Sequence, residues 1–326
     1  MQHKFLQNNK LQVSPLGFGS WAIGGEMMMR GVQAGWGEVD DAESIRAIHA
    51  ALAGGITLID TAANYGTGHS EEIIAQAIQG RREEVVLATK FGFNVDEAAK
   101  TVDLQTPDAI IENINSECER SLRHLHTDVI DIYQFHMWDF PPERVPELID
   151  KLESLITQGK IRSYGWSTDN IELAHLFATQ DNCTTIQHEA NVMQPAAEMF
   201  ALTAETDVVS LIRSPLMMGF LSDKYDNNSV FTDTDIRSHW FKPEQIAKIV
   251  SNRGKIREIL ASNGRSTVQG ALAWLWATGD QVVPIPGIRT EAQAIENAAA
   301  MEFGPLTAEQ MTEIEQLLGR EEIVTT

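Results

Sequence analysis

An acid and a phenol stand five positions apart in the stretch DTAANYG, directly after the apolar run GITLI. Asp60 ends that run and Tyr65 follows it, while Lys90 and His136 each end another β-rich run. Reduction of a carbonyl by hydride needs a proton donor for the oxygen, and a phenol serves if its pKa, about 10 when unperturbed, falls toward the working pH. A nearby ammonium lowers that pKa, and a carboxylate keeps a buried ammonium charged. The four side chains therefore suit proton-assisted hydride chemistry, with His136 bonded to the substrate oxygen or tuning the donor.

These four residues can meet only if the runs that end in them lie side by side. Short β-rich runs alternate with longer amphipathic ones along most of the chain, which is typical of βαβ units around a parallel sheet. We expect strands at residues 15–19, 56–60, 84–90, 128–136, 161–167, 184–189, 207–214 and 281–287. Eight such strands favour a closed (β/α)8 TIM barrel over an open doubly wound sheet. A barrel builds its active site at the C-terminal ends of its strands, where the four residues stand.

One helix is clearly marked between the third and fourth expected strands. Residues 107–125 place Ile110, Ile114 and Cys118 on one face at helical spacing. Thr106 fits an N-cap, followed by Pro at the first helical position. This pattern predicts an amphipathic helix that covers the sheet.

The rest of the chain predicts additions to one barrel rather than a second domain. Residues 4–13 suggest a β-hairpin around Asn8 and Asn9, which would close the bottom of the barrel. The polar stretch 222–243 is too long for a simple connection, so we expect a functional loop or a lid there. Since no linker, internal repeat or low-complexity tract interrupts the chain, we expect residues 1–326 to form a single domain.

The composition narrows the possible partners. Lys and Arg number 25 against 46 Asp and Glu, and the resulting net charge of -21 repels nucleic acid and anionic membrane surfaces. The N-terminus has no apolar signal region, and no run reaches the roughly 18 apolar residues of a membrane span. Cys118 and Cys183 lack metal-ligand spacing and are expected to be reduced core residues, with no metal site. We therefore expect a cytoplasmic protein whose phosphate-bearing ligands bind at a local basic or dipolar site.

Three blocks carry a resemblance to a known family. GITLIDTAANYG, VVLATKFG and DVIDIYQFH resemble the signature blocks of the aldo-keto reductases, and the resemblance spans about residues 12–320. It assigns the family's catalytic tetrad to Asp60, Tyr65, Lys90 and His136, and the WAIGG and HSEE segments are similar to those of bacterial members. The resemblance implies an NADP(H)-dependent oxidoreductase that reduces aldehydes or ketones. Its barrel would hold an extended cofactor without a Rossmann domain, which accounts for the absence of a G-x-G-x-x-G motif and of a P-loop.

The resemblance also implies which residues contact the nicotinamide end of the cofactor. These are Ser20, Trp21, Asp60, Ser167, Thr168 and Gln187. Thr168 stands where the family usually has Asn, which weakens one contact. Arg213 replaces a Tyr that usually stacks on the nicotinamide ring, and its guanidinium plane could stack there or simply form an ion pair.

The phosphate and adenosine contacts follow from two further blocks. The segment RSPLMMGFLSDKY implies diphosphate contacts from Ser214, Leu216, Gly219 and Lys224. The segment IPGIRTEAQAIENAAA implies contacts to the adenosine end from Gly287, Arg289, Gln293, Glu296 and Asn297. A helix that begins near Thr290 turns amide groups toward phosphate, and Arg289 suits the 2′-phosphate of NADP. Gly287, however, stands where many members carry a phosphate-binding Lys.

The substrate pocket is less well marked by the sequence. Trp21, Trp36 and Trp138 lie in expected loops at strand ends, as do the methionines of residues 26–29, and apolar side chains there would line a pocket. Trp240 in the long loop could close it. Each of these side chains also suits ordinary core packing. Adaptable methionines would favour several small carbonyl compounds over one rigid substrate.

Two other functions remain open. Lys90 could form a Schiff base as in barrel aldolases, although the neighbouring Asp60 disfavours the neutral amine that this needs. The potassium-channel β subunits also resemble this chain, so a non-catalytic protein that binds nicotinamide and senses redox state or a partner is the main alternative. We expect the protein to be a monomer or a weak oligomer.

Overall fold

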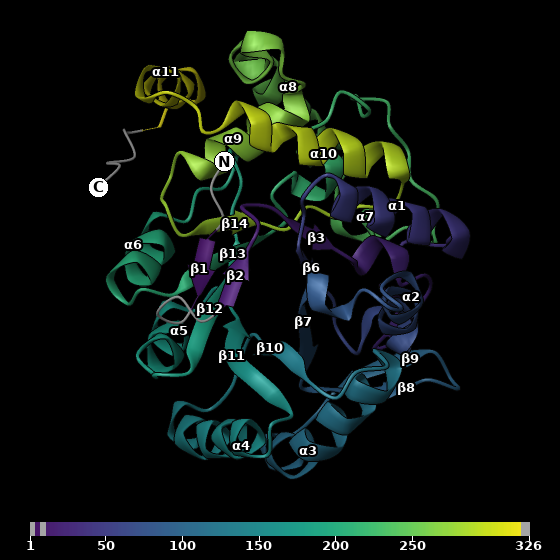
Figure 1. The fold of residues 1–326 in the computed structure, drawn as a ribbon. Coiled ribbons are helices and arrows are strands. Elements are labelled where there is room, and N and C mark those ends of the chain that lie inside the picture. Colours follow the sequence, from purple (N-terminus) through teal and green to yellow (C-terminus); the bar gives the residue numbers. More distant parts are fainter. Residues whose placement is uncertain (1–3, 7–10, 321–326) are drawn as a thin grey trace.

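Eight parallel strands form the central sheet of the computed structural model, which describes residues 4–6 and 11–320 (Figure 1). The strands are β3 (Gly17–Gly19), β6 (Leu58–Asp60), β7 (Val86–Phe91), β10 (Ile130–Phe135), β11 (Ile161–Ser167), β12 (Cys183–Glu189), β13 (Val209–Arg213) and β14 (Val282–Pro284). Neighbours in the sheet follow chain order, as βαβ connections require. Several strands, such as β7 and β10, are buried along their whole length, because helices cover the outside and side chains fill the inside.

The sheet closes on itself where β3 meets β14. Gly19 pairs with Gly287, its N–H donates to the Pro286 carbonyl at 2.9 Å, and its own carbonyl accepts from Ile288 at 3.1 Å. A Cβ at Gly19 would lie 2.6 Å from the Ile285 carbonyl oxygen, so the closure requires glycine there. The predicted (β/α)8 barrel is confirmed.

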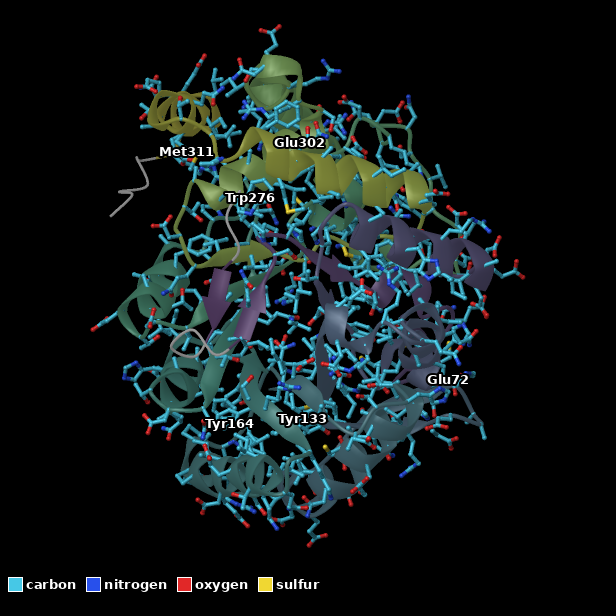
Figure 2. The ribbon with its side chains drawn as sticks, viewed as in Figure 1. Glu72, Tyr133, Tyr164, Trp276, Glu302 and Met311 are labelled. Atoms are coloured by element: carbon cyan, nitrogen blue, oxygen red, sulfur yellow. The ribbon has the colours of Figure 1, made fainter. Side chains whose placement is uncertain are left out.

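Helices surround the barrel in Figure 1. Their bounds are α1 (Asp41–Ala53), α2 (His69–Ala77), α3 (Pro107–His124), α4 (Val145–Thr157), α5 (Ile171–Ala178), α6 (Ala197–Glu205), α7 (Arg237–Trp240), α8 (Pro243–Leu260), α9 (Thr267–Trp276), α10 (Glu291–Phe303) and α11 (Ala308–Leu318). The predicted helix is α3, and Thr106 caps it by accepting from the Ala109 N–H at 3.3 Å. Figure 2 contrasts buried Tyr133 and Tyr164 with Glu72 and Glu302 on the outer faces of helices.

The N-terminal hairpin covers the bottom of the barrel, as expected. β1 (Lys4–Leu6) pairs antiparallel with β2 (Leu11–Val13), while the predicted turn at Asn8 and Asn9 lies outside the described residues. Val13 is fully buried against the apolar side chains that fill the barrel interior, among them Leu58 and Val86.

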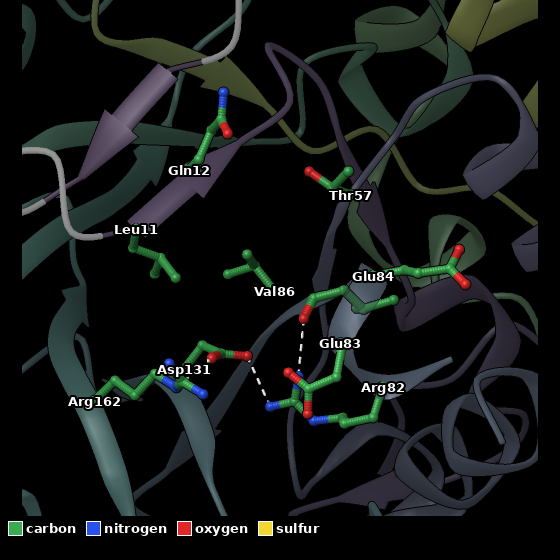
Figure 3. A pocket seen from close by; sticks show the side chains of 10 residues that line it. Leu11, Gln12, Thr57, Arg82, Glu83, Glu84, Val86, Asp131 and Arg162 are labelled. Atoms are coloured by element: carbon green, nitrogen blue, oxygen red, sulfur yellow. Dashed lines mark hydrogen bonds and ion pairs between the residues drawn. The ribbon is translucent and has the colours of Figure 1, made fainter. Parts of the chain in front are cut away.

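A polar pocket of about 240 Å³ lies beside β2 at the same end of the barrel (Figure 3). Arg82 crosses it and donates to Asp131 Oδ2 at 2.8 Å, and Arg162 Nε approaches Asp131 Oδ1 at 2.9 Å. The pocket opens at the N-terminal ends of β7 and β10, so it belongs to the face opposite the tetrad.

The top of the barrel carries short strands beyond the eight that the sequence predicted. β4 (Met28–Met29) and β5 (Val32–Gln33) join β8 (Phe93–Asp96) and β9 (Thr101–Leu104) in a four-stranded sheet. The methionine run was expected as a loop and instead contributes β4, because its backbone pairs with β9.

The long stretch after β13 is tied to the loop after β3. It contains α7. The Ile236 N–H donates to the Gly35 carbonyl at 3.2 Å, and Asp235 forms an antiparallel β-bridge with Trp36. A segment that is remote in sequence thus crosses the mouth of the barrel.

The two cysteines are free and buried, as predicted, and burial raises the pKa of each thiol to about 12. In residues 4–6 and 11–320 no helix has the length and apolarity of a membrane span. Nor does this part of the chain contain a group of three acidic, histidine or cysteine side chains placed to hold a metal ion.

Candidate active site

Lys90 links two other members of the predicted tetrad, Asp60 and Tyr65, at the C-terminal ends of the strands. Its Nζ donates to Asp60 Oδ2 at 2.7 Å, to the Tyr65 hydroxyl at 3.2 Å and to the Thr61 carbonyl at 2.8 Å. Asp60 and Lys90 lie on the neighbouring strands β6 and β7, and the loop after β6 brings Tyr65 back over the ammonium. The Lys90 side chain is completely buried, so these oxygens replace the water that a charged amine would otherwise require.

Two amide side chains fix the other oxygen of Asp60. Gln134 and Gln187 each donate to Asp60 Oδ1, at 3.0 and 2.8 Å. Gln187 was a predicted site residue, but Gln134 was not. Its signal in the sequence was its position two residues before His136 in the expected strand 128–136, because alternate residues of a strand share a face. The paired register of Gln134 with Lys90 explains why the amide reaches the carboxylate.

The charges of this cluster follow from burial and from the pairing. Burial lowers the pKa of Lys90, but Asp60 and Tyr65 outweigh it, so the pKa of Lys90 is raised and its ammonium stays charged, as expected. Burial raises the pKa of Tyr65, and although the charge of Lys90 lowers it, the net shift is upward. The lowered phenol pKa expected from the sequence is therefore not found, because the sequence does not reveal how deeply the hydroxyl is buried. A raised pKa keeps Tyr65 protonated at neutral pH, which is the state that donates a proton.

His136 completes the cluster one residue beyond β10. Its ring centre lies 6.1 Å from that of Tyr65, and the two rings are nearly perpendicular, at 84°. Burial, together with the charges of Lys90 and Arg213, places the pKa of His136 well below its ordinary value. Nδ1 of this neutral imidazole is buried and has no hydrogen-bond partner in the described part of the chain.

The loop that carries Tyr65 is held in an unusual backbone conformation. Gly66 and Thr67 have φ angles of 59° and 57°, and Gly68 has a φ of 100°. A Cβ at Gly66 would lie 1.7 Å from the Gly24 carbonyl oxygen. Glycine at positions 24 and 66 therefore allows this loop to pack against the loop after β3. Backbone strain of this kind is commonly kept at functional sites.

The predicted nicotinamide contacts come together beside Asp60. Ser167 is paired in register with Gln187, and its hydroxyl lies 3.5 Å from the Gln187 side-chain oxygen. The Thr168 N–H donates to the Gln187 carbonyl at 2.9 Å. Ser20 lies on the other side, where its N–H donates to the Asp60 carbonyl at 3.0 Å.

Arg213 is engaged in ion pairs at the end of β13. It donates to Glu189 at 2.8 Å and also to Asp169. The ion-pair alternative that the sequence left open is therefore present, and the stacking role stays a prediction. The predicted diphosphate contacts are Ser214, Leu216, Gly219 and Lys224, all in the segment that follows β13.

The segment after β13 is strained. Ser214, Met217 and Met218 have φ angles of 54°, 48° and 55°, which non-glycine residues rarely adopt. Lys224 is exposed beyond this turn, and its ammonium lies 5.3 Å from the centre of the Tyr225 ring.

The predicted adenosine contacts surround the start of α10. Arg289 points toward the loop after β3, where it donates to the Trp36 carbonyl at 3.2 Å and to the Glu38 carbonyl. Gln293 forms a capping box with Thr290 and also accepts from the Arg289 N–H at 2.8 Å. The remaining predicted contacts are Gly287, exposed beside the closure of the barrel, Glu296, and the buried Asn297.

Three tryptophans gather over Tyr65. Trp21 stacks on Tyr65 with ring centres 6.1 Å apart, and it also contacts Trp36 at 5.5 Å and Trp240 at 5.7 Å. Trp138 stands apart from this group and contacts Phe93 beside His136. The buried Nε1 atoms of Trp21 and Trp36 have no partner in the described ranges, so two indole donors remain to be satisfied at the barrel mouth.

Comparisons with known proteins agree with this geometry. The model of the aldo/keto reductase family matches residues 15–318. Aldo-keto reductase YhdN of Bacillus subtilis is 31% identical over 98% of this chain and 94% of its own length, and an NADH-specific methylglyoxal reductase of Escherichia coli is 29% identical over 91% and 92%. Among solved structures, a glycerol dehydrogenase of Gluconobacter oxydans superposes with a TM-score of 0.82 at 30% identity, over 97% of this chain and 95% of that one. The chain therefore belongs to the aldo/keto reductase family.

Proposed function

We propose that this protein reduces aldehydes or ketones with NADPH and that Tyr65 is the general acid. The carrying observation is the buried chain of contacts from Asp60 through Lys90 to the Tyr65 hydroxyl, at 2.7 and 3.2 Å. In this arrangement the carboxylate keeps the ammonium charged, and the ammonium stabilises the phenolate that remains after proton transfer.

The bound nicotinamide supplies the hydride, and the residues of this chain supply the proton and the orientation. Tyr65 is protonated at neutral pH and gives its proton to the carbonyl oxygen. His136 is neutral, so it does not replace Tyr65 as the proton donor and adds no second positive charge beside Lys90. Its unpartnered Nδ1 and the Nε1 of Trp21 are buried polar atoms that a nicotinamide or a substrate oxygen would satisfy.

The residues at the barrel mouth suit such a cofactor along its whole length. Ser167, Thr168 and Gln187 would hold the carboxamide, and Lys224 with the turn after Arg213 would hold the diphosphate. Arg289 and the start of α10 provide cationic and amide groups for a 2′-phosphate, which supports NADPH over NADH. The name of one relative specifies NADH, so parallel titrations with NADPH and NADH test this preference.

The substrate is proposed to be a small carbonyl compound that enters beside Trp36 and Trp138. Two relatives are named for methylglyoxal reduction and glycerol oxidation, so short oxygenated carbonyls are the first compounds to screen. We further propose that the protein works in the cytoplasm as a monomer or weak oligomer.

The test is Tyr65→Phe. Loss of the proton donor should reduce kcat for carbonyl reduction by about 10²–10⁴-fold, the usual range for general acid catalysis. The Kd for NADPH should stay within about twofold, since the phenol hydroxyl is bonded to Lys90 and not to the predicted cofactor contacts.

Tyr164→Phe is the matched control, because it also removes a buried hydroxyl, one that bonds Glu153 outside the barrel at 2.8 Å. This variant should keep its activity. Full activity in Tyr65→Phe would remove Tyr65 from the mechanism, and binding of NADPH without turnover of any carbonyl by the wild type would favour the non-catalytic alternative.

A further inference from the structure

A carboxylate of the chain itself lies at the start of α10. Glu43 on α1 accepts from the backbone N–H of Glu291, the first residue of α10, at 2.9 Å through Oε1. Its Oε2 accepts two N–H groups of Arg46, at 3.1 and 2.5 Å. The Glu291 N–H and then Arg46 lower the pKa of Glu43, so it carries its full negative charge at neutral pH.

Three further N–H groups at this position are also engaged. The N–H groups of Arg289 and Thr290 donate to the Gln293 side chain, and the Gln293 N–H donates to the Thr290 hydroxyl. The Arg289 guanidinium is bonded to the carbonyls of Trp36 and Glu38. A phosphate that binds the Glu291 N–H or the Arg289 guanidinium must replace acceptors that already exist, and among those acceptors Glu43 is the one with a negative charge.

The surroundings reinforce this charge. Asp40 caps α1 by accepting from the Glu43 N–H, and Asp41, Glu38 and Glu291 stand close in sequence or in space. Asp41 is paired with His69 at 2.9 Å, while Arg46 is paired with Glu43 itself. The part of the site where a cofactor phosphate would be recognised is therefore mixed in charge.

We propose that Glu43 sets the choice between the two nicotinamide cofactors. This inference rests on the proposed function. Glu43 occupies the α10 amide as an internal anion and repels a 2′-phosphate, so the wild type discriminates only weakly in favour of NADPH. The ribose hydroxyls of NADH carry no charge and are not repelled. Glu43 thus offsets the attraction between Arg289 and the 2′-phosphate of NADPH.

Glu43→Gln tests this directly in the full chain. The amide oxygen can still accept from the Glu291 N–H, so α10 keeps its contact while the charge is removed. Tryptophan fluorescence titrations at low salt should show about tenfold tighter binding of NADPH and no more than about twofold change for NADH, because repulsion between surface charges is strongest there. Adenosine 2′,5′-bisphosphate should gain affinity in the same way, whereas AMP should not.

Glu84→Gln is the matched control. Glu84 is paired with Arg81 at 2.6 Å in the same i,i+3 arrangement, but it lines the pocket at the opposite end of the barrel. This variant loses the same charge and should leave both affinities unchanged.

The outcomes separate the two proposals. If both proteins bind the dinucleotides and the ratio of NADPH affinity to NADH affinity is the same in wild type and in Glu43→Gln, the proposed role of Glu43 is wrong and the proposed function stands. An equal gain in both control and variant would assign the effect to net charge and would also overturn the proposal. If the wild type binds neither dinucleotide, the proposed function fails and the selectivity inference fails with it.

Discussion

Replacement of Asp60 by Asn should leave a buried charge without its counter-ion. Lys90 is fully buried, and its ammonium has one charged partner, at 2.7 Å, beside two neutral oxygens. An Asn cannot serve both neighbours, because Gln134 and Gln187 donate to one oxygen of Asp60 while Lys90 donates to the other. Removal of one partner of a buried ion pair typically costs about 3–5 kcal/mol.

The expected change in melting temperature follows from the size of the chain. An unfolding entropy of about 2.1 cal/mol/K per residue gives roughly 0.7 kcal/mol/K for 326 residues. The loss therefore corresponds to a decrease in Tm of about 4–7 °C at pH 7. Carbonyl reduction should fall as well, since Lys90 loses the carboxylate that keeps it charged beside Tyr65.

The pH dependence gives a second readout with a defined sign. The pKa of Lys90 is raised in the wild type, so its stabilising contribution is complete below the unfolded pKa and is lost as the pH rises through the folded pKa. In Asp60→Asn, burial still lowers the pKa of Lys90, and the carboxylate that mainly raised this pKa is gone. The stability deficit of the variant should therefore shrink as the pH rises from 7 toward 10.

Calorimetry of four proteins checks this reasoning. Asp131→Asn breaks a second buried pair, with Arg82, at the bottom of the barrel and should lose comparable stability with unchanged activity. The double variant Asp60→Asn, Lys90→Met removes both partners and should recover part of the Tm. The explanation is refuted if Asp60→Asn melts like the wild type or if the double variant is no more stable than Asp60→Asn.

Two further changes test the loop and a second buried residue. Gly66→Ala places a Cβ 1.7 Å from the Gly24 carbonyl oxygen at a φ of 59°, so we expect a displaced Tyr65 and a lower kcat, measured against Gly80→Ala, which also has a positive φ but open space around it. His188 is buried, and burial lowers its pKa to about 4. Its folded pKa lies below the unfolded value of about 6.5, so stability is lost as the pH falls between these values, by about 2–3 kcal/mol at pH 4.5. Urea unfolding measures the free energy of unfolding at pH 7 and at pH 4.5, and the loss between the two should be smaller in His188→Gln than in the wild type by that amount. An equal loss in both proteins would contradict the neutral state assigned to His188.

The tetrad could be found from sequence because each member ends a strand or closely follows one. Strand ends of a parallel barrel converge, so Asp60, Lys90 and His136 are neighbours as soon as the strands are placed in order. β11 has the predicted bounds, and the other barrel strands differ by one to three residues at an end. Strand centres are marked by continuous apolar runs, whereas strand ends depend on which carbonyl finds a partner.

Other contacts had no local signal. The four-stranded sheet at the top uses strands of two to four residues, too short for an alternating pattern. Glu43 and Glu291 are hydrogen-bonded although they are 248 residues apart in sequence, and the residues around neither one predict this contact. The pKa of Tyr65 depends on burial by Trp21 and by the loop after β3, which are tertiary features.

The two ends of the site differ in how much must change when a cofactor binds. Around Lys90 the donors and acceptors are already paired in the geometry that the proton transfer needs, so the chemical step requires little reorganisation. At the adenosine end Arg289 is bonded to carbonyl groups of the chain, and Glu43 accepts a hydrogen bond from an amide of α10. Binding there exchanges internal contacts for contacts to the cofactor, and the free energy of binding is the small difference between the two sets. Substitutions of charge at this end should therefore alter cofactor affinity and selectivity far more than kcat, whereas substitutions around Lys90 should do the reverse.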